Sequence, residues 1–161
     1  MTESERHASH SAADTEAFGR QLSSRLRAGD VVLLEGHLGA GKTTLIRGLT
    51  EGLEGDPDDV SSPSFVIIQT YDCGAPGIGR LHHVDLYRLA ERAADLREIG
   101  IEEVLSDPEA VTAVEWPKAA LATWIPADAR LWRIQLSLRE GDTREILVVP
   151  PSPNQGRRSS D

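Results

Sequence analysis

The sequence predicts an α/β fold in which a mixed, mostly parallel central sheet lies between layers of helices. Short apolar runs alternate along the chain with segments of helical periodicity, which is typical of strands joined by helices. No internal repeat is present. The last two apolar runs are separated only by the short turn REGDT, so the final two strands are expected to pair antiparallel.

Each element is predicted from its own stretch of sequence. Apolar side chains recur at helical spacing across residues 12–26, so a helix is expected before the first core strand. The predicted strands are residues 31–34, 65–70, 81–85, 111–115, 131–138 and 145–149. The other predicted helices are residues 42–53, 89–96 and 117–124. Within residues 42–53, Gly48 is expected to weaken the helix slightly.

Length and composition fit one domain with flexible termini. The 161 residues are 39% hydrophobic and 27% charged, which is ordinary for a chain that buries a core. We expect a single domain over residues 12–150. Because both ends are polar, residues 1–11 are predicted to form a flexible N-terminus and residues 151–161 a disordered tail.

Charge and cysteine content limit the partners and the compartment. A net charge of −9 argues against a protein that binds a nucleic-acid backbone alone, so any RNA or DNA role is expected to require a partner. The single Cys73 cannot form an internal disulfide, which favours a reducing compartment. The N-terminus lacks the apolar core of a signal peptide, and no run approaches the roughly 18 apolar residues of a membrane span. The expected location is the cytoplasm.

The stretch VVLLEGHLGAGKTTL, residues 31–45, joins an expected strand to a glycine-rich turn and an expected helix. The spacing G-x-x-x-x-G-K-[ST] is met by Gly36, Gly41, Lys42 and Thr43. Glycine is needed because consecutive N–H groups must point at one anion, which a Cβ would obstruct. The fold class is therefore a three-layer fold of the P-loop NTPase type. Nucleotide is expected on Gly36, His37, Leu38, Gly39, Ala40, Gly41, Lys42, Thr43 and Thr44.

Two strand-end acids are candidates for catalysis with Mg²⁺. Lys42 is expected to neutralise the phosphates, and the Thr43 hydroxyl to bind Mg²⁺ together with a carboxylate from a neighbouring strand. Glu115 ends the apolar run AVTAVE, as a buried strand does. Asp85 ends LHHVD, whose two histidines point to opposite faces and cannot share one site. Glu115 is expected to bind the metal and Asp85 to orient the attacking water, but the sequence allows the reverse.

Several features bear on the choice of nucleotide and on other activities. The chain lacks the Asn/Thr-Lys-x-Asp segment with which Ras-type GTPases recognise guanine, so ATP is favoured over GTP. Thr15 and Phe18 are candidates near the base, because the helix that precedes the loop's strand can border the nucleotide. The arginines of YRLAERAADLREIG resemble a kinase lid, but interspersed acids favour a salt-bridged solvent face. These arginines are Arg88, Arg92 and Arg97.

Five segments occur in an order and at spacings that match a known family. GHLGAGKTTLIRGL, SSPSF, HHVDLYRL, IGIEEVL and AVEWP, between about residues 12 and 149, closely resemble the TsaE (YjeE) family. The resemblance implies a small P-loop fold with a mixed sheet, binding of ATP and Mg²⁺, and slow ATP hydrolysis. It also implies action with the TsaD and TsaB proteins in threonylcarbamoyl modification of adenosine 37 of tRNA. Contact with tRNA would then be indirect, and neither DNA nor a membrane is an expected partner.

The resemblance assigns further roles to matching residues. The family's Ser-Pro-Thr-Phe segment falls on SPSF, in which Ser64 replaces the usual threonine and keeps a hydroxyl near the γ-phosphate. The family's functional aspartate matches Asp85, and its Glu-Trp pair matches Glu115 and Trp116. Trp116 is expected at the nucleotide, although a core-filling aromatic is the other interpretation. His37 stands where aspartate is common, and it is expected to change only the pH dependence of hydrolysis.

The predicted function is that of a Mg²⁺-dependent ATPase, slow alone and stimulated by partners, with Lys42, Glu115 and Asp85 as its catalytic residues. Two alternatives remain open at this point. A small-molecule kinase would use the arginine-bearing segment as a lid. A nucleotide-sensing adaptor would bind ATP without turning it over, but paired carboxylates at strand ends argue against this.

Overall fold

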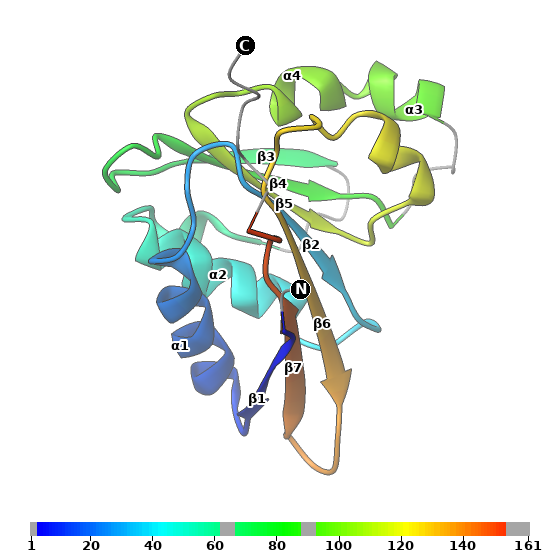
Figure 1. Ribbon diagram of the computed structural model, residues 1–161. Helices are drawn as coiled ribbons and strands as arrows, with labels where there is room; N and C mark the ends of the chain where they lie inside the picture. Colours follow the sequence, from blue (N-terminus) through cyan, green and yellow to red (C-terminus); the bar gives the residue numbers. More distant parts are fainter. Residues whose placement is uncertain (1–2, 62–66, 88–92, 154–161) are drawn as a thin grey trace.

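The computed structural model describes residues 3–61, 67–87 and 93–153, which form a seven-stranded sheet with helices against both faces (Figure 1). In chain order the strands are β1 (Glu5–Ser9), β2 (Val31–Glu35), β3 (Ile68–Asp72), β4 (Arg80–Asp85), β5 (Ala110–Glu115), β6 (Leu131–Leu138) and β7 (Arg144–Val149). The helices are α1 (Ala12–Ser23), α2 (Lys42–Gly52), α3 (Ala93–Glu98) and α4 (Ile101–Leu105). Two 3₁₀ turns are η1 (Pro57–Asp59) and η2 (Ala119–Thr123).

The sheet has the order β1-β7-β6-β2-β5-β4-β3 and is mixed, as predicted. Its centre is parallel, because β2 pairs with both β5 and β6, and β4 pairs with β5. The expected antiparallel pairing of β6 and β7 is present, and β1 and β3 add antiparallel pairings at the two edges. Across the described strands, antiparallel pairings are therefore as numerous as parallel ones. The parallel register places Glu115 opposite both Leu34 and Asp85.

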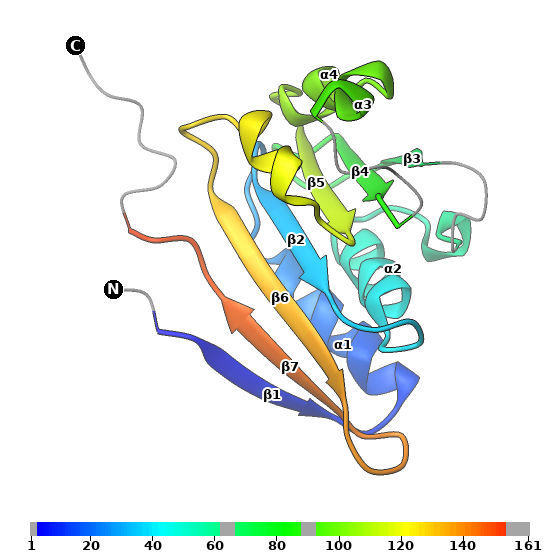
Figure 2. The same cartoon turned by 90° about the vertical axis from the view of Figure 1, so that its right-hand side faces the viewer.

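Two clusters of buried side chains lie on opposite faces of the sheet. On one face, α1 and α2 cover alternate residues of the central strands, with Leu45, Ile46 and Leu49 of α2 fully buried. On the other face, α3, α4 and η2 cover residues such as Leu33 and Val114. Figure 2 shows that α3, α4 and η2 lie over β2, β4, β5 and the start of β6, and leave β7 and β1 uncovered on that side. No helix in the described ranges is long and apolar enough to cross a membrane.

Several predicted boundaries differ from the structure. Residues 5–9, expected to be flexible, form the edge strand β1. Its side chains are mostly exposed and polar, so the sequence has no apolar pattern that indicates a strand. The predicted strand over 65–70 is observed as β3, although residues 65 and 66 lie outside the described part. The predicted helix over 89–96 begins outside it as well, and α3 is followed by α4 after Gly100, which has φ 88°. The helix predicted over 117–124 is the 3₁₀ turn η2, and α1 ends at Ser23 rather than at residue 26.

Glycines allow α1 and α2 to pack with their backbones in contact. A Cβ on Gly48 would lie 2.1 Å from the carbonyl oxygen of Glu16, and one on Gly19 would lie 2.4 Å from that of Leu45. Both distances are far shorter than a van der Waals contact. Gly48 therefore contributes to helix packing, in addition to the weakening of α2 that the sequence predicted.

Gly48→Ala is expected to lower the free energy of unfolding by about 1–3 kcal/mol, because the clash outweighs a gain of at most about 1 kcal/mol in helix propensity. Urea unfolding measures the change. Gly79→Ala is the matched control, since its new Cβ would meet the Glu109 carbonyl oxygen at 3.9 Å, an ordinary contact. A Gly48→Ala variant as stable as the parent would contradict this packing.

Candidate nucleotide-binding site

The loop between β2 and α2 has the backbone of an anion site. Gly41 has φ 106°, a left-handed conformation that favours glycine, and it directly precedes α2. A Cβ on Gly36 would lie 2.7 Å from the carbonyl oxygen of Leu136, so a larger residue would displace the loop. No side chain caps the N-terminus of α2, and its first turn has no acidic residue. The unpaired N–H groups and the positive end of the helix dipole therefore fit a phosphate.

Lys42 is folded into this loop. Its side chain is only 5% exposed, and Nζ donates a hydrogen bond to the carbonyl oxygen of Gly36. Nζ also lies 3.5 Å from the centre of the Trp116 ring, within the range of a cation–π interaction. Burial lowers the pKa of Lys42 below its usual value, and the carboxylates of Glu115 and Asp85 oppose this shift. The loop thus holds a buried cation whose present contacts a phosphate oxygen can replace.

Trp116 follows directly after β5 in an unusual backbone conformation. Its φ is 56°, which is rare for a non-glycine residue, and its N–H donates to the carbonyl oxygen of Leu34 at 3.3 Å. Its ring centre lies 4.9 Å from that of Tyr87. The strained turn directs the indole toward Lys42, so the structure places Trp116 beside the phosphate loop rather than within either buried cluster.

Glu115 lies between the loop and the neighbouring strand β4. It is 3% exposed, and both of its carboxylate oxygens lie 3.4 Å from Oγ1 of Thr43. A shorter contact, 2.6 Å, joins Oε2 of Glu115 to Nε2 of His83. His83 was not among the predicted site residues. A signal for it existed, because His83 precedes Asp85 by two residues and therefore points to the same face of β4.

Asp85 borders the same site from the end of β4. One of its carboxylate oxygens accepts the N–H of Tyr87 at 3.0 Å. Burial raises the pKa of Asp85 above its usual value of 3.8, and the Glu115 charge raises it further, against the lowering effect of Lys42. The structure thus places a carboxyl group with a raised proton affinity next to the candidate metal ligand.

The oxygen atoms of Thr43 and Glu115 fit Mg²⁺, which needs few protein ligands, better than they fit a metal ion whose ligands all come from the protein. Among the described residues, no group of three or more His, Cys, Asp or Glu side chains is placed to hold a metal ion. Thr43 and Glu115 instead present oxygen atoms beside a phosphate-binding loop. Mg²⁺ commonly takes one or two protein oxygens and completes its shell with water and substrate phosphates.

Two cavities adjoin the loop. One of about 310 Å³ lies toward α1 and is lined by Thr15, Gly41, Thr44 and Arg144, among others. Arg144, which was not among the predicted site residues, donates to the carbonyl oxygen of Gly39 at 3.3 Å. No local pattern marks it, because it comes from β7 at the far end of the chain. The other cavity, about 640 Å³, lies between Trp116, Lys118 and the end of β6.

The remaining predicted residues lie in different places. His37, Leu38 and Gly39 are exposed at the tip of the loop, whereas Ala40 is buried beneath it. Phe18 packs against His7, with ring centres 4.8 Å apart, and it does not line the cavity that contains Thr15. Ser64, Arg88 and Arg92 lie outside the described residues. Arg97 is exposed on α3.

The fold and the loop define a protein of the P-loop class. The chain belongs to the TsaE family, because residues 9–146 match the family model described as threonylcarbamoyl adenosine biosynthesis protein TsaE. It is 42% identical over 131 residues to the tRNA threonylcarbamoyladenosine biosynthesis protein TsaE of Streptomyces coelicolor, covering 80% of this chain and 82% of that protein. The Bacillus subtilis protein of the same name is 40% identical over 135 residues, 83% of this chain and 77% of that protein. The crystal structure of Bacillus subtilis YdiB is similar, with a TM-score of 0.70 and 28% identity, covering 94% of this chain and 88% of that one.

Asp85→Asn is expected to raise the thermal unfolding midpoint at pH 7 in the absence of nucleotide and metal. Because the folded pKa of Asp85 is raised, its ionisation costs stability as pH rises from the unfolded value of 3.8 through the folded value. The gain should therefore vanish below pH 3.8, where the parent carboxyl is protonated. Calorimetry at several pH values, with the exposed Asp142→Asn as control, tests this. An equal gain at all pH values would contradict it.

Proposed function

We propose that the protein is a Mg²⁺-dependent ATPase that acts in tRNA threonylcarbamoyladenosine biosynthesis in the cytoplasm, together with TsaD and TsaB proteins. The observation that carries the proposal is the placement of Lys42 and Thr43, at the uncapped start of α2, against the buried carboxylate of Glu115. Membership of the TsaE family supports the pathway, because the relatives from S. coelicolor and B. subtilis are named for it.

The site residues divide the work of binding and hydrolysis. The N–H groups at the start of α2 and the ammonium of Lys42 bind the phosphates, with Lys42 giving up its contact to Gly36. Thr43 and Glu115 hold Mg²⁺, which neutralises the charge that develops during phosphoryl transfer. Asp85, whose pKa is raised, orients the attacking water and accepts its proton.

The cavity beside α1 supplies space for the rest of the nucleotide. Its volume is about 310 Å³, and Gly41 and Thr44 line it from the phosphate loop and the start of α2. Thr15 lines it from α1, and the guanidinium of Arg144 approaches it from β7. We assign this cavity to the ribose and base, with Thr15 as the predicted contact.

Trp116 contacts Lys42 and so controls the position of the phosphate-binding cation.

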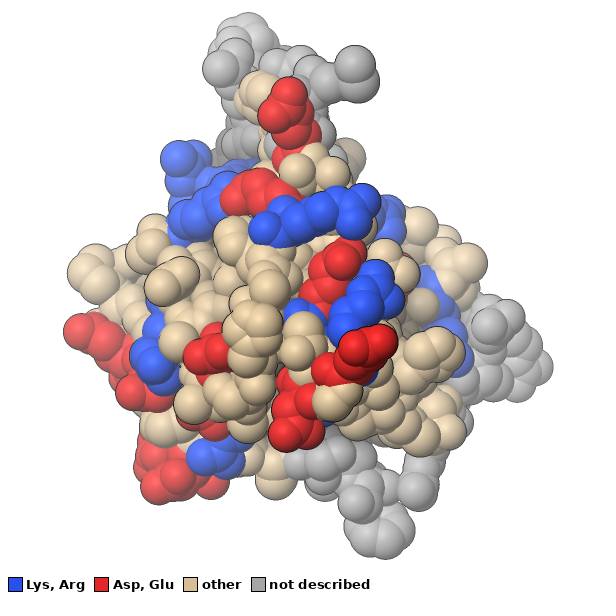
Figure 3. Space-filling model, turned by 90° about the horizontal axis from the view of Figure 1, so that it is seen from below, with Lys and Arg blue, Asp and Glu red and all other residues tan. Residues whose placement is uncertain are grey.

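Charge supports an indirect relation to tRNA. On the face drawn in Figure 3, Lys and Arg side chains alternate with Asp and Glu. Arg6 and Arg139, for example, both pair with Glu145, at 3.0 and 3.3 Å. A net charge of −9 adds a long-range repulsion for phosphate backbones. Contact with tRNA is therefore expected to require the partner proteins.

Lys42→Ala is expected to weaken ATP binding by about 1.5–3 kcal/mol, because it removes a charge-assisted contact to phosphate. Calorimetry on a folded variant measures the loss. Lys118 lines the other cavity, so Lys118→Ala is the matched control and should leave the affinity for ATP nearly unchanged. Unaltered affinity in Lys42→Ala would rule out the assigned phosphate site.

The two acids should separate in their effects. Glu115→Ala is expected to abolish the tightening of ATP binding by Mg²⁺, because it removes a buried oxygen ligand. Asp85→Ala should keep most of that tightening and lower turnover instead. Calorimetry with and without Mg²⁺, combined with steady-state rates, distinguishes the two. The opposite pattern would exchange the assigned roles.

Turnover by the protein alone is expected to be slow and to rise with partner proteins rather than with tRNA alone. P-loop proteins that lack an inserted arginine run several orders of magnitude below their assisted rates. Rates should be compared for the protein alone, with tRNA, with TsaD and TsaB, and with all three. Many turnovers per second by the lone protein, unaffected by the pair, would contradict an accessory ATPase. A phosphorylated small molecule in an acceptor screen would indicate a kinase, and absence of turnover in every mixture an adaptor.

A further inference from the structure

We propose that His83 is a positioning residue, which holds the Glu115 carboxylate in the orientation that binds Mg²⁺ and is itself held by Tyr71. This inference rests on the proposed function, since it assigns a residue to the same metal site. His83 comes from β4 and Tyr71 from β3, so the support for Glu115 extends across two neighbouring strands.

The contacts form a continuous chain from the metal site into the sheet. Nε2 of His83 lies 2.6 Å from Oε2 of Glu115, and Nδ1 lies 2.9 Å from the hydroxyl of Tyr71. That hydroxyl also lies 2.5 Å from Oε1 of Gln69. The His83 side chain is fully buried, Glu115 is 3% exposed and Tyr71 is 5% exposed. Water therefore has little access with which to replace these contacts.

The short contact to His83 determines how Glu115 is oriented. An ionised carboxylate only accepts hydrogen bonds, so Nε2 of His83 is the donor. The two contacts from Thr43 are longer, at 3.4 Å each, and they constrain the carboxylate weakly. Both oxygens lie equally far from Thr43, but Oε2 is bound to His83, so Oε1 is the oxygen left for the metal assigned beside Thr43. Partners that orient a ligating carboxylate commonly change metal affinity by about 10–100-fold.

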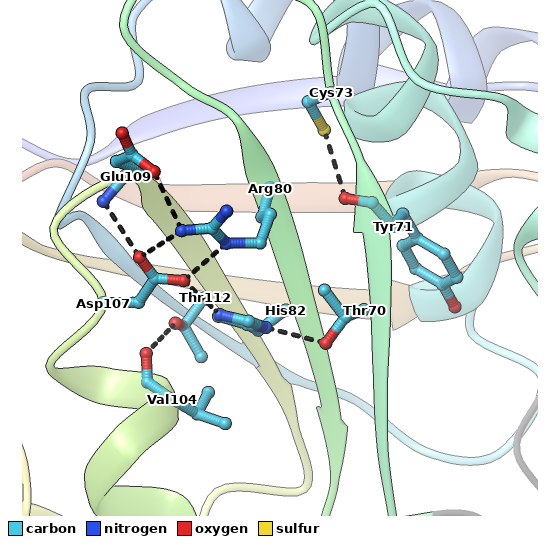
Figure 4. A network of polar contacts seen from close by, with 9 residues as sticks. All are labelled: Thr70, Tyr71, Cys73, Arg80, His82, Val104, Asp107, Glu109 and Thr112. Atoms are coloured by element: carbon cyan, nitrogen blue, oxygen red, sulfur yellow. Dashed lines mark hydrogen bonds and ion pairs between the residues drawn. The ribbon is translucent and has the colours of Figure 1, made fainter.

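The adjacent His82 provides a matched comparison. It lies on the same strand and is 7% exposed, but its ring points to the opposite face of the sheet. Figure 4 shows His82 between Thr70 and Asp107, at 2.9 and 2.8 Å, while Tyr71 points away from this group. Arg80 contacts the same Asp107 through two hydrogen bonds and so completes a network that is separate from Glu115. A change at His82 perturbs β4 without touching the proposed metal ligand.

The test measures ATP affinity by calorimetry over a range of Mg²⁺ concentrations with the full chain. In His83→Ala, the Mg²⁺ concentration that gives half of the tightening should rise about tenfold or more, while affinity without Mg²⁺ stays the same. His83→Gln keeps an N–H donor near the position of Nε2 and should restore most of the dependence. Tyr71→Phe should give a smaller rise, and His82→Ala should leave the Mg²⁺ dependence unchanged. Thermal unfolding of each variant records the purely structural effect.

The outcomes separate this inference from the proposed function. If the parent protein shows no tightening by Mg²⁺, the proposed function fails and the role of His83 fails with it. If Mg²⁺ strengthens ATP binding to the parent and to His83→Ala at the same Mg²⁺ concentration, only the role of His83 is overturned. This holds whatever the change in thermal stability. Equal shifts in His83→Ala and His83→Gln would also overturn it. If His83→Ala does not fold, Tyr71→Phe decides, because an unchanged Mg²⁺ dependence there contradicts the proposal.

Discussion

The buried carboxylate of Glu115 ends the central strand β5, and the arrangement around the phosphate loop depends on how that charge is accommodated. Parallel pairing places β5 between β2, which leads into the loop, and β4, which carries Asp85 and His83. The carboxylate is thereby brought against the start of α2, where it meets Thr43. A buried charge without partners would cost the fold several kcal/mol. The contacts that satisfy Glu115 are therefore also the ones that assemble the site.

The ammonium group of Lys42 already has contacts inside the phosphate loop. Lys42 occupies the interior of the loop, bound to the Gly36 carbonyl oxygen and covered by the indole of Trp116. The left-handed backbone of Trp116 and its hydrogen bond to Leu34 fix that indole relative to β2. In the proposed function, a bound phosphate replaces these contacts, so the net gain from Lys42 is the difference between two sets of favourable interactions. The proposed phosphate site therefore depends on the turn after β5, because that turn places the indole against Lys42.

Local sequence patterns predicted the loop and the two strand-end acids, and contacts between distant segments supplied the rest. The loop was predictable because its glycines, lysine and threonine act within nine residues that the backbone itself arranges. Asp85 and Glu115 were predictable because acids that end apolar strands meet at one edge of a parallel sheet. Arg144 was not, since it reaches the loop only through the register of β7. The edge strand β1 was missed for a related reason, because its polar sequence forms a strand only by pairing with β7.

A crystal structure of the protein with Mg²⁺ and a non-hydrolysable ATP analogue tests the central claim most directly. The account predicts the phosphates at the start of α2, with Nζ of Lys42 moved from Gly36 to a phosphate oxygen. Mg²⁺ should contact Thr43 and Glu115 directly or through one water, and the base should lie in the cavity beside Thr15. Nucleotide in the cavity between Trp116 and β6, with Lys42 still bound to Gly36, would contradict the account.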